Sequence, residues 1–163
     1  MTTTAYNKRA NFDYLISDKY EAGLVLTGQE VKSVKAGHIS LKESFVTVKG
    51  GELYLTNAHI TPYKHAGEIT NYDPTRPRKL LLKKSEIRRL VGKVRTEGLT
   101  LVPIRVYTKK RPASPTSLGK STSQGGLLKL EFGVGKGKKK FDKREDLAKK
   151  DAKRNMQRAL KNF

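Results

Sequence analysis

A tight hairpin at Gly50-Gly51 constrains the fold of this chain more than any other feature of the sequence. Two runs of alternating β-forming residues, FVTVK and ELYLT, flank the pair, and glycine permits the positive φ angles that a type I′ turn requires. A two-residue loop fixes the cross-strand pairs as Lys49 with Glu52, Val48 with Leu53, Thr47 with Tyr54 and Val46 with Leu55. Since this register places the four Val and Leu side chains on one face, the segment predicts an antiparallel sheet with an apolar side.

Further strands are expected at residues 12–17, 20–26, 99–108 and 127–132, where β-forming residues cluster. The apolar register of the 99–108 run shifts at Leu101-Val102, beside Pro103, which predicts a bulge or an edge position there. A short helix over 28–36 should end at Gly37. A second helix should begin near Ser85 as N-cap and end before Gly98, with one apolar face made of Ile87, Leu90, Val91 and Val94.

This order of elements favours a mainly β, α+β fold over a parallel sheet, because most elements are short strands with only a helix or two between them. We expect an antiparallel barrel or sandwich over residues 1–134. Residues 111–126, RPASPTSLGKSTSQGG, are rich in Pro, Ser, Thr and Gly and are predicted to form a flexible loop. Residues 135–163 form a separate C-terminal tail.

The tail carries twelve Lys or Arg against four Asp or Glu, and most of its apolar residues are small. It therefore cannot build a core, and its charge matches a phosphate backbone. Asp142 as N-cap and Glu145 three residues later predict a marginal helix that frays when free and forms on RNA. Phe141 beside this start has no core partner nearby and could stack on a nucleobase. The alternatives are a merely solubilising tail and a Phe141 that folds back onto the barrel.

Composition and motifs disfavour an enzyme or a metalloprotein. The chain has no Cys, and its three histidines, His38, His59 and His65, belong to no metal-binding motif. Gly119-Lys120-Ser121 lacks the first glycine of a phosphate loop. We expect no catalytic residues, no metal and no cofactor. A net charge of +20 and the absence of a signal-peptide or membrane-length apolar run indicate a cytoplasmic protein that binds nucleic acid and not membranes.

Single residues in this body allow more than one interpretation. Glu21, Glu30 and Glu43 are most simply solvated surface carboxylates, although Glu21 could accept from base amino groups or orient a neighbouring cation. Tyr54 and Tyr107 could serve as stacking platforms, but core-edge positions explain them equally well.

Several segments, NKRANFDYLI, YEAGLVLTGQEVKSVKAG, the hairpin leading to HITPY, DPTRPRKLLLKKSEI and GKGKKKFDKRED, together resemble the SsrA-binding protein (small protein B) family over nearly the whole chain. The resemblance implies an oligonucleotide-binding-like antiparallel β-barrel with flanking helices and a basic tail. It also implies a monomeric adaptor for transfer-messenger RNA, which the family delivers to bacterial ribosomes stalled on messages without a stop codon. The alternative is a ribosomal protein or a general single-stranded RNA binder.

The same resemblance implies two sets of RNA-binding residues. The barrel set, which would grip the tRNA-like part of the RNA, comprises Asn7, Lys8, Arg9, Glu21, Leu81, Lys83 and Lys129. The tail set, which would enter the empty message channel and decoding centre of the 70S ribosome, comprises Lys136, Lys138, Lys139, Phe141, Asp142, Lys143 and Arg144. Phe141 stands where the family places an aromatic or His that stacks on ribosomal RNA. Two departures are Lys83, where some members carry an uncharged polar residue, and the length of the 111–126 connection.

Overall fold

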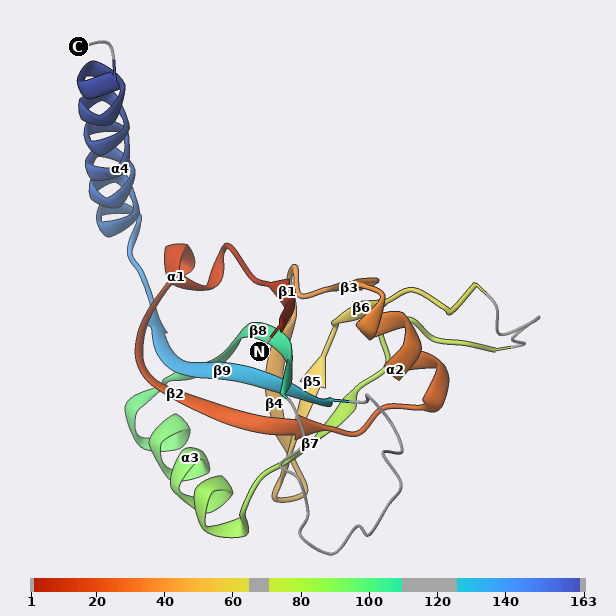
Figure 1. Cartoon of the computed structure of the whole chain (residues 1–163). Coiled ribbons are helices and arrows are strands. Elements are labelled where there is room, and N and C mark those ends of the chain that lie inside the picture. The colour runs from red at the N-terminus through yellow and green to blue at the C-terminus, as the bar shows by residue number, and fades with distance from the viewer. Residues whose placement is uncertain (1, 65–70, 110–125, 162–163) are drawn as a thin grey trace, which may run out of the picture.

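The computed structural model describes residues 2–64, 71–109 and 126–161, and the predicted loop at 111–126 lies outside these residues except for Gly126. Figure 1 shows how the elements are arranged. The strands are β1 Thr2–Tyr6, β2 Tyr14–Leu24, β3 Ile39–Ser40, β4 Phe45–Lys49, β5 Glu52–Thr56, β6 His59–Ile60, β7 Arg78–Leu81, β8 Thr100–Lys109 and β9 Leu127–Gly137. The helices are α1 Ala10–Asp13, α2 Gly28–Lys35, α3 Lys84–Glu97 and α4 Lys140–Lys161.

The main sheet closes on itself, as the predicted antiparallel barrel requires. Its hydrogen-bonded order runs β8, β4, β5, β7, β2 and β9, and β9 pairs again with β8. All of these pairings are antiparallel, and β1 adds to β8 at its outer side. Closure leaves few open strand edges and encloses one core, while the helices flank the barrel.

The hairpin has the predicted register, with all four expected pairs present between β4 and β5. Gly50 and Gly51 adopt φ angles of 59° and 74°, as a type I′ turn requires. Val46, Leu53 and Leu55 are buried, whereas Val48 beside the turn is 37% exposed.

The prediction of two strands at 12–17 and 20–26 is wrong, because β2 runs unbroken from Tyr14 to Leu24 after the short helix α1. Its register with β9 shifts between Ile16 and Asp18, so Ser17 is the extra residue of a bulge. The Ser17 hydroxyl donates to the Val134 carbonyl at 3.0 Å. The polar residues around Ser17, which resemble a turn in the sequence, therefore form a bend within one strand. β8 has a bulge beside Pro103, but it lies after the proline and not at Leu101-Val102 as predicted, since the register of β8 with β9 shifts between Pro103 and Arg105.

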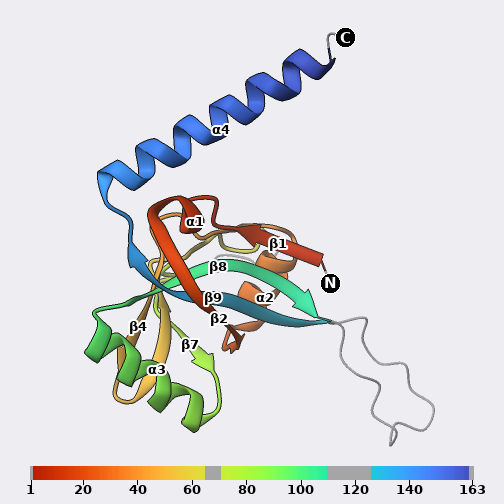
Figure 2. The ribbon, with the colours of Figure 1, turned by 90° about the vertical axis from the view of Figure 1, so that its left-hand side faces the viewer.

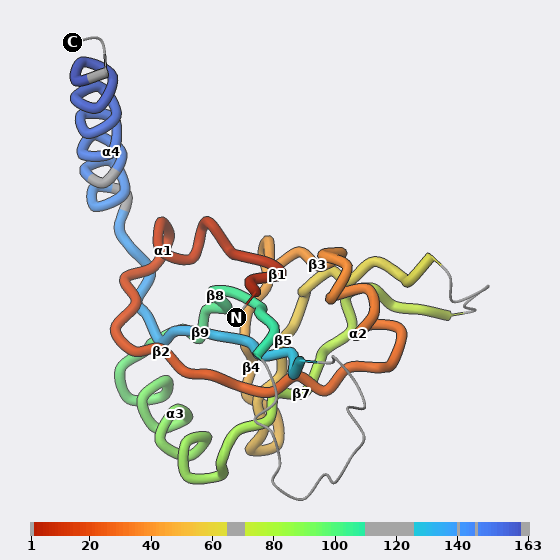
Figure 3. The backbone as a smooth tube through the Cα atoms, in the orientation of Figure 1, coloured from red at the N-terminus to blue at the C-terminus, as the bar shows by residue number. Residues whose placement is uncertain are grey.

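β2 and β9 lie side by side along most of their length, and two glycines of β9 make this close approach feasible (Figure 3). A Cβ atom on Gly133 would lie 2.5 Å from Cγ2 of Ile16, and one on Gly135 would lie 2.7 Å from the carbonyl oxygen of Leu15. Because the pairing continues to Gly137, the first three residues of the predicted tail are part of the sheet.

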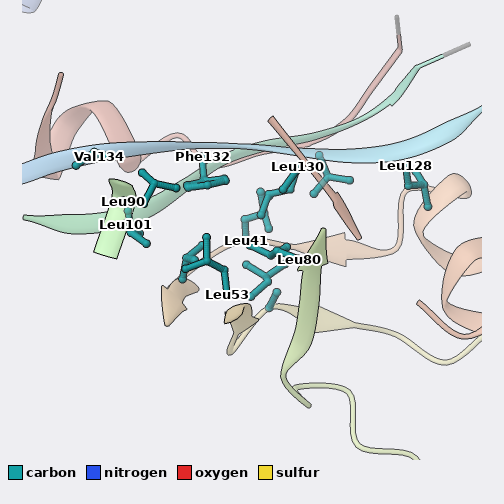
Figure 4. Packing of buried hydrophobic residues seen from close by; sticks show 14 of the residues in the cluster. Leu41, Leu53, Leu80, Leu90, Leu101, Leu128, Leu130, Phe132 and Val134 are labelled. Atoms are coloured by element: carbon teal, nitrogen blue, oxygen red, sulfur yellow. The ribbon is translucent and has the colours of Figure 1, made fainter. Parts of the chain in front are cut away.

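The core is continuous from β9 across the barrel to β5 and β7 (Figure 4). Leu130, Phe132 and Val134 of β9 are fully buried and face Leu53 and Leu80 from the opposite wall. α3 closes one end of the barrel with Ile87 and Leu90, as its apolar spacing predicts. Gly98 ends this helix in the left-handed region, also as predicted.

Glu30 is not a solvated surface carboxylate, because it is only 1% exposed. Its Oε1 accepts from Nη2 of the fully buried Arg78 at 2.8 Å, and Arg76 forms a second ion pair with the same carboxylate. Arg78 also donates to the carbonyl oxygens of Ala58 at 2.5 Å and Pro74 at 2.8 Å. This network ties α2 to the segment that leads into β7.

Candidate nucleic-acid interface

Glu21 on β2 is the centre of a polar cluster formed by three strands. The hydroxyl of Tyr107 on β8 donates to its carboxylate. The ammonium groups of Lys109 and Lys129 lie 3.1 and 3.3 Å from Glu21 Oε1. Since β9 pairs with both β2 and β8, the sheet itself places these side chains together. Glu21 therefore orients neighbouring cations, one of the two roles considered for it from the sequence.

The protonation states in this cluster are well defined at neutral pH. The hydrogen bond from Tyr107, supported by Lys109 and Lys129, lowers the pKa of Glu21 to about 2. Burial, together with the hydrogen bond to Glu21, raises the pKa of Tyr107 to about 12. Tyr107 is only 4% exposed, so it is not a stacking platform.

Leu81 and Lys83 lie next to the Glu21 cluster. Gly23 pairs with Leu81 of β7 on one side and with Lys129 of β9 on the other. A shallow groove runs from Glu21 past Leu81 to Lys83, at the residue that precedes α3. Leu81 is 54% exposed in this groove. An apolar side chain bordered by cations suits a nucleotide, whose base or sugar contacts the apolar group while its phosphate meets the lysines.

The remaining barrel residues, Asn7, Lys8 and Arg9, form a second group after β1. The Asn7 side chain donates to the Pro103 carbonyl at 3.0 Å and accepts from the Arg9 backbone at 3.2 Å. Asn7 thus shapes this turn by internal hydrogen bonds, while Lys8 and Arg9 are exposed. This group borders residues 39–42 and not the groove beside Leu81.

The beginning of the tail is docked on α1 through Asp13. The backbone NH of Lys138 donates to the Asp13 carbonyl at 2.9 Å, and the Lys143 ammonium lies 2.7 Å from the Asp13 carboxylate. Arg9 contacts the other oxygen of that carboxylate at 3.1 Å. The hydrogen bond from Lys143, together with the charge of Arg9, lowers the pKa of Asp13. One carboxylate therefore connects the Asn7–Arg9 group to the tail.

α4 begins at Lys140, two residues before the predicted start, so Asp142 is not its N-cap. Asp142 lies in the first turn, and its carboxylate accepts from the Lys139 backbone NH at 3.0 Å. Phe141 is 74% exposed, so the alternative in which it folds back onto the barrel is wrong. Glu145 pairs with Lys149 at 2.6 Å along the helix.

α4 points away from the barrel, as Figure 2 shows. Its described side chains are exposed apart from the half-buried Lys143. Arg144 is exposed beside Phe141, and Lys136 and Lys138 belong to the strand end and the link before the helix. The tail residues therefore form one continuous basic stretch from the end of β9 into α4, and this stretch is helical from Lys140 onward in the chain alone.

Sequence reasoning missed Lys109 and Asp13 as parts of these clusters. Lys109 stands in no recognisable motif, and Asp13 lies in the segment NKRANFDYLI without a role that the sequence reveals. Each acquires its role from a partner far along the chain: Lys109 from Glu21, and Asp13 from Lys143. Only the pairing of β8 with β9 and the docking of α4 on α1 bring these groups together.

Over residues 2–64, 71–109 and 126–161, no group of three or more His, Cys, Asp or Glu side chains could hold a metal ion. None of the helices in the same ranges is long and apolar enough to span a membrane.

Comparisons with known proteins agree on one family. The family model described as SmpB protein matches residues 4–162. The SsrA-binding protein of Alkaliphilus metalliredigens is 51% identical over 156 residues, which cover 96% of this chain and 89% of that protein. The SsrA-binding protein of Bacillus pumilus is 48% identical over 155 residues, covering 95% and 89%. A solved structure described as "tmRNA-SmpB: a journey to the center of the bacterial ribosome" matches with a TM-score of 0.61 and 45% identity, covering 83% of this chain and 84% of the other.

Proposed function

Because the chain belongs to the SmpB protein family, we propose that it binds transfer-messenger RNA and delivers it to stalled ribosomes as a non-enzymatic adaptor of trans-translation. The observation that carries this proposal is the groove beside Glu21, where Leu81, Lys83 and Lys129 meet on one face of the barrel. An ionised Glu21 there orients Lys109 and Lys129 and also offers an acceptor to a base amino group. The chain works as a monomer in the cytoplasm, where ribosomes are found.

The tail has a different task in this proposal. A helix of 22 residues with exposed cations suits a narrow channel lined by RNA phosphates, such as the vacant message channel of the small ribosomal subunit. The exposed ring of Phe141, next to Asp142, Lys143 and Arg144, stacks on a base of the decoding centre. The helix thereby takes the place of the missing codon–anticodon pairing.

A general single-stranded RNA binder fits the barrel less well. Such proteins present aromatic platforms on which successive bases stack. Here Tyr107 is buried and bonded to Glu21, and the Tyr54 hydroxyl donates to Glu52 at 2.9 Å. The Tyr107 ring is therefore inaccessible and the Tyr54 hydroxyl is already bonded on the outer face of the sheet, which favours an adaptor for a structured RNA.

Ending the chain at Lys139 separates the two tasks. This variant keeps all of β9 and the Lys138 contacts to α1, so we expect it to bind the tRNA-like part of transfer-messenger RNA within about threefold of the full chain. Tagging of nascent chains on stalled ribosomes should be lost. Equal loss of binding and tagging would contradict the division of tasks.

Phe141→Ala tests the stacking role directly. We expect unchanged binding to free RNA and tagging slowed by about fivefold or more, as the loss of one stacking interaction of about 1–3 kcal/mol implies. Met156→Ala is a matched control, because Met156 is a similarly exposed apolar residue, 69% against 74%, farther along the same helix. If both variants tag at the same rate, Phe141 has no special role at the start of the helix.

A further inference from the structure

The outer face of α3 carries five cations, of which only Lys93 forms an ion pair with the barrel. Lys84, Arg88 and Arg95 follow i, i+4 and i+11 spacing and thus form one exposed row. Arg89 and Lys93 form a second row on the other side of the helix. Between the rows lie three small exposed residues, namely Ser85, Gly92 and Thr96.

These rows have different neighbours in the barrel. Lys93 pairs with Asp18 of β2 at 2.6 Å, so the second row faces β2. Within the described part of the chain, Lys84, Arg88, Arg89 and Arg95 make no ion pair within 4.0 Å and no side-chain hydrogen bond. Four cations on one short helix are therefore available to an outside partner.

Two residues of α3, Gly92 and Lys84, make the helix less stable than it could be. Gly92 stands in the middle of α3, where glycine is less favourable than alanine. A Cβ atom there would meet no other atom within 4 Å, so packing within the chain does not demand glycine. Lys84 stands in the first turn, where the helix dipole disfavours a cation. Residues that lower the stability of a helix without improving packing inside the protein are typical of a binding surface.

We propose that this outer face of α3 is a second RNA-binding surface that grips the backbone of double-stranded RNA. The two rows of cations would reach the phosphates of the two strands, and the small residues between them would let the helix approach the wide, shallow minor groove. Charge identifies the partner, since the unpaired cations Lys84, Arg88 and Arg95 on one side of the helix and Arg89 on the other complement the phosphates of two strands. At about 1.5 Å per residue, the 14 residues of α3 extend roughly 21 Å along such a duplex.

The surface is continuous with the groove beside Glu21, because Lys83 at the end of that groove is the residue before α3. The inference nevertheless goes beyond the proposed function and does not depend on it, since a plain duplex carries no tRNA-like shape. A duplex arm that leaves the groove at Lys83 would run along α3.

The test measures binding of the full chain to a fluorescent 20-base-pair RNA duplex over a series of salt concentrations. The variant K84Q/R88Q/R95Q removes one row, and the matched control K35Q/K49Q/K64Q removes three exposed lysines elsewhere. We expect the α3 variant to bind at least tenfold more weakly than the control. Its log–log salt dependence should be less steep by about 2 to 3, as the loss of three phosphate contacts requires. If both variants weaken duplex binding equally, the proposal is overturned, because the net charge of the chain alone would then explain the binding.

Two further measurements separate this surface from its alternatives. Gly92→Gln should raise the melting temperature and yet weaken duplex binding by threefold or more; unchanged affinity would overturn the close approach along the small residues. Poly-glutamate at equal charge concentration should displace the duplex poorly, and efficient displacement would show a surface for acidic proteins instead. A chain that bound the duplex through α3 but ignored the tRNA-like RNA would refute the proposed function and not this inference.

Discussion

At the scale of single residues, burial decides which acidic side chains matter. Glu30, Glu21 and Glu43 are indistinguishable by composition, yet Glu30 is 1% exposed and paired with two arginines, whereas Glu43 is exposed beside Lys42 at 3.7 Å. Burial alone would raise the pKa of Glu30, but the hydrogen bonds from Arg76, Thr27 and Arg78 lower it. The sequence could not separate these residues, because Arg76 and Arg78 are more than forty positions away.

Glu30→Gln should destabilise the fold by about 3–5 kcal/mol, because Arg78 would remain buried without a counter-charge. The free energy of unfolding in urea measures this loss. Glu43→Gln is the matched control and should change the stability by less than about 0.5 kcal/mol. If the two variants are equally stable, the buried network does not hold α2 in place.

Glu21 predicts a specific dependence of stability on pH. Its pKa falls from an ordinary 4.5 to about 2 in the folded chain, so folding favours the ionised form. The stability that this carboxylate contributes should be fully present above about pH 5.5 and should disappear as the pH falls through 4.5 towards 2. The difference in unfolding free energy between the wild type and Glu21→Gln, measured from pH 3 to pH 7, reports this change. A difference that stays constant over this range would contradict the lowered pKa.

At the scale of elements, the three longer helices share one way of starting. In each, a carboxylate in the first turn accepts from the backbone NH three residues earlier: Glu30 from Thr27 at 2.9 Å, Glu86 from Lys83 at 3.1 Å and Asp142 from Lys139 at 3.0 Å. Placing Asp142 or Ser85 as the N-cap therefore shifted the predicted helix starts. The acidic residue marks the third position of the helix, which would have placed both starts correctly.

Local chemistry predicted the hairpin and the face of α3 because each depends on residues close in sequence. β2 was divided into two strands because its bulge at Ser17 is fixed by β9, more than a hundred residues away. The candidate site shows the same limit: the resemblance supplied Glu21 and Lys129, but not their contacts with Tyr107 and Lys109.

The joint between α1 and α4 is the element-scale feature that depends most on one residue. Asp13 holds Lys143 at 2.7 Å and Arg9 at 3.1 Å. Asp13→Asn should loosen α4 from the barrel, so the amide groups around Lys143 should show faster motion in ¹⁵N relaxation experiments. Glu145→Gln serves as the control, because it removes the Lys149 pair within α4 and leaves α1 untouched. Equal mobility in the two variants would mean that the barrel does not orient the tail through Asp13.

At the scale of the whole molecule, the closure of the β-barrel and the position of the tail depend on contacts between residues far apart in the sequence. β9 is the strand on which both depend, since it pairs with β2 and β8 and then leads directly into α4. The alternation in 127–132 predicted its first half. Residues 135–137 read as a basic linker in the sequence, and their pairing with Tyr14–Ile16 becomes evident only when the barrel closes.

The barrel and α4 should therefore unfold independently, with the boundary after Gly137 and not before it. Ending the chain at Lys139 removes the Lys143–Asp13 pair but no buried side chain, and partly exposed ion pairs contribute only about 0–1 kcal/mol. We expect the melting temperature to fall by less than about 5 °C. Ending it at Gly133 instead removes the fully buried Val134 and the last pairs with β2, so this variant should melt at least 10 °C lower or fail to fold. Calorimetry of the full chain and the two shortened chains gives the three melting temperatures. A large decrease in the melting temperature of the Lys139 variant would mean that α4 unfolds cooperatively with the barrel.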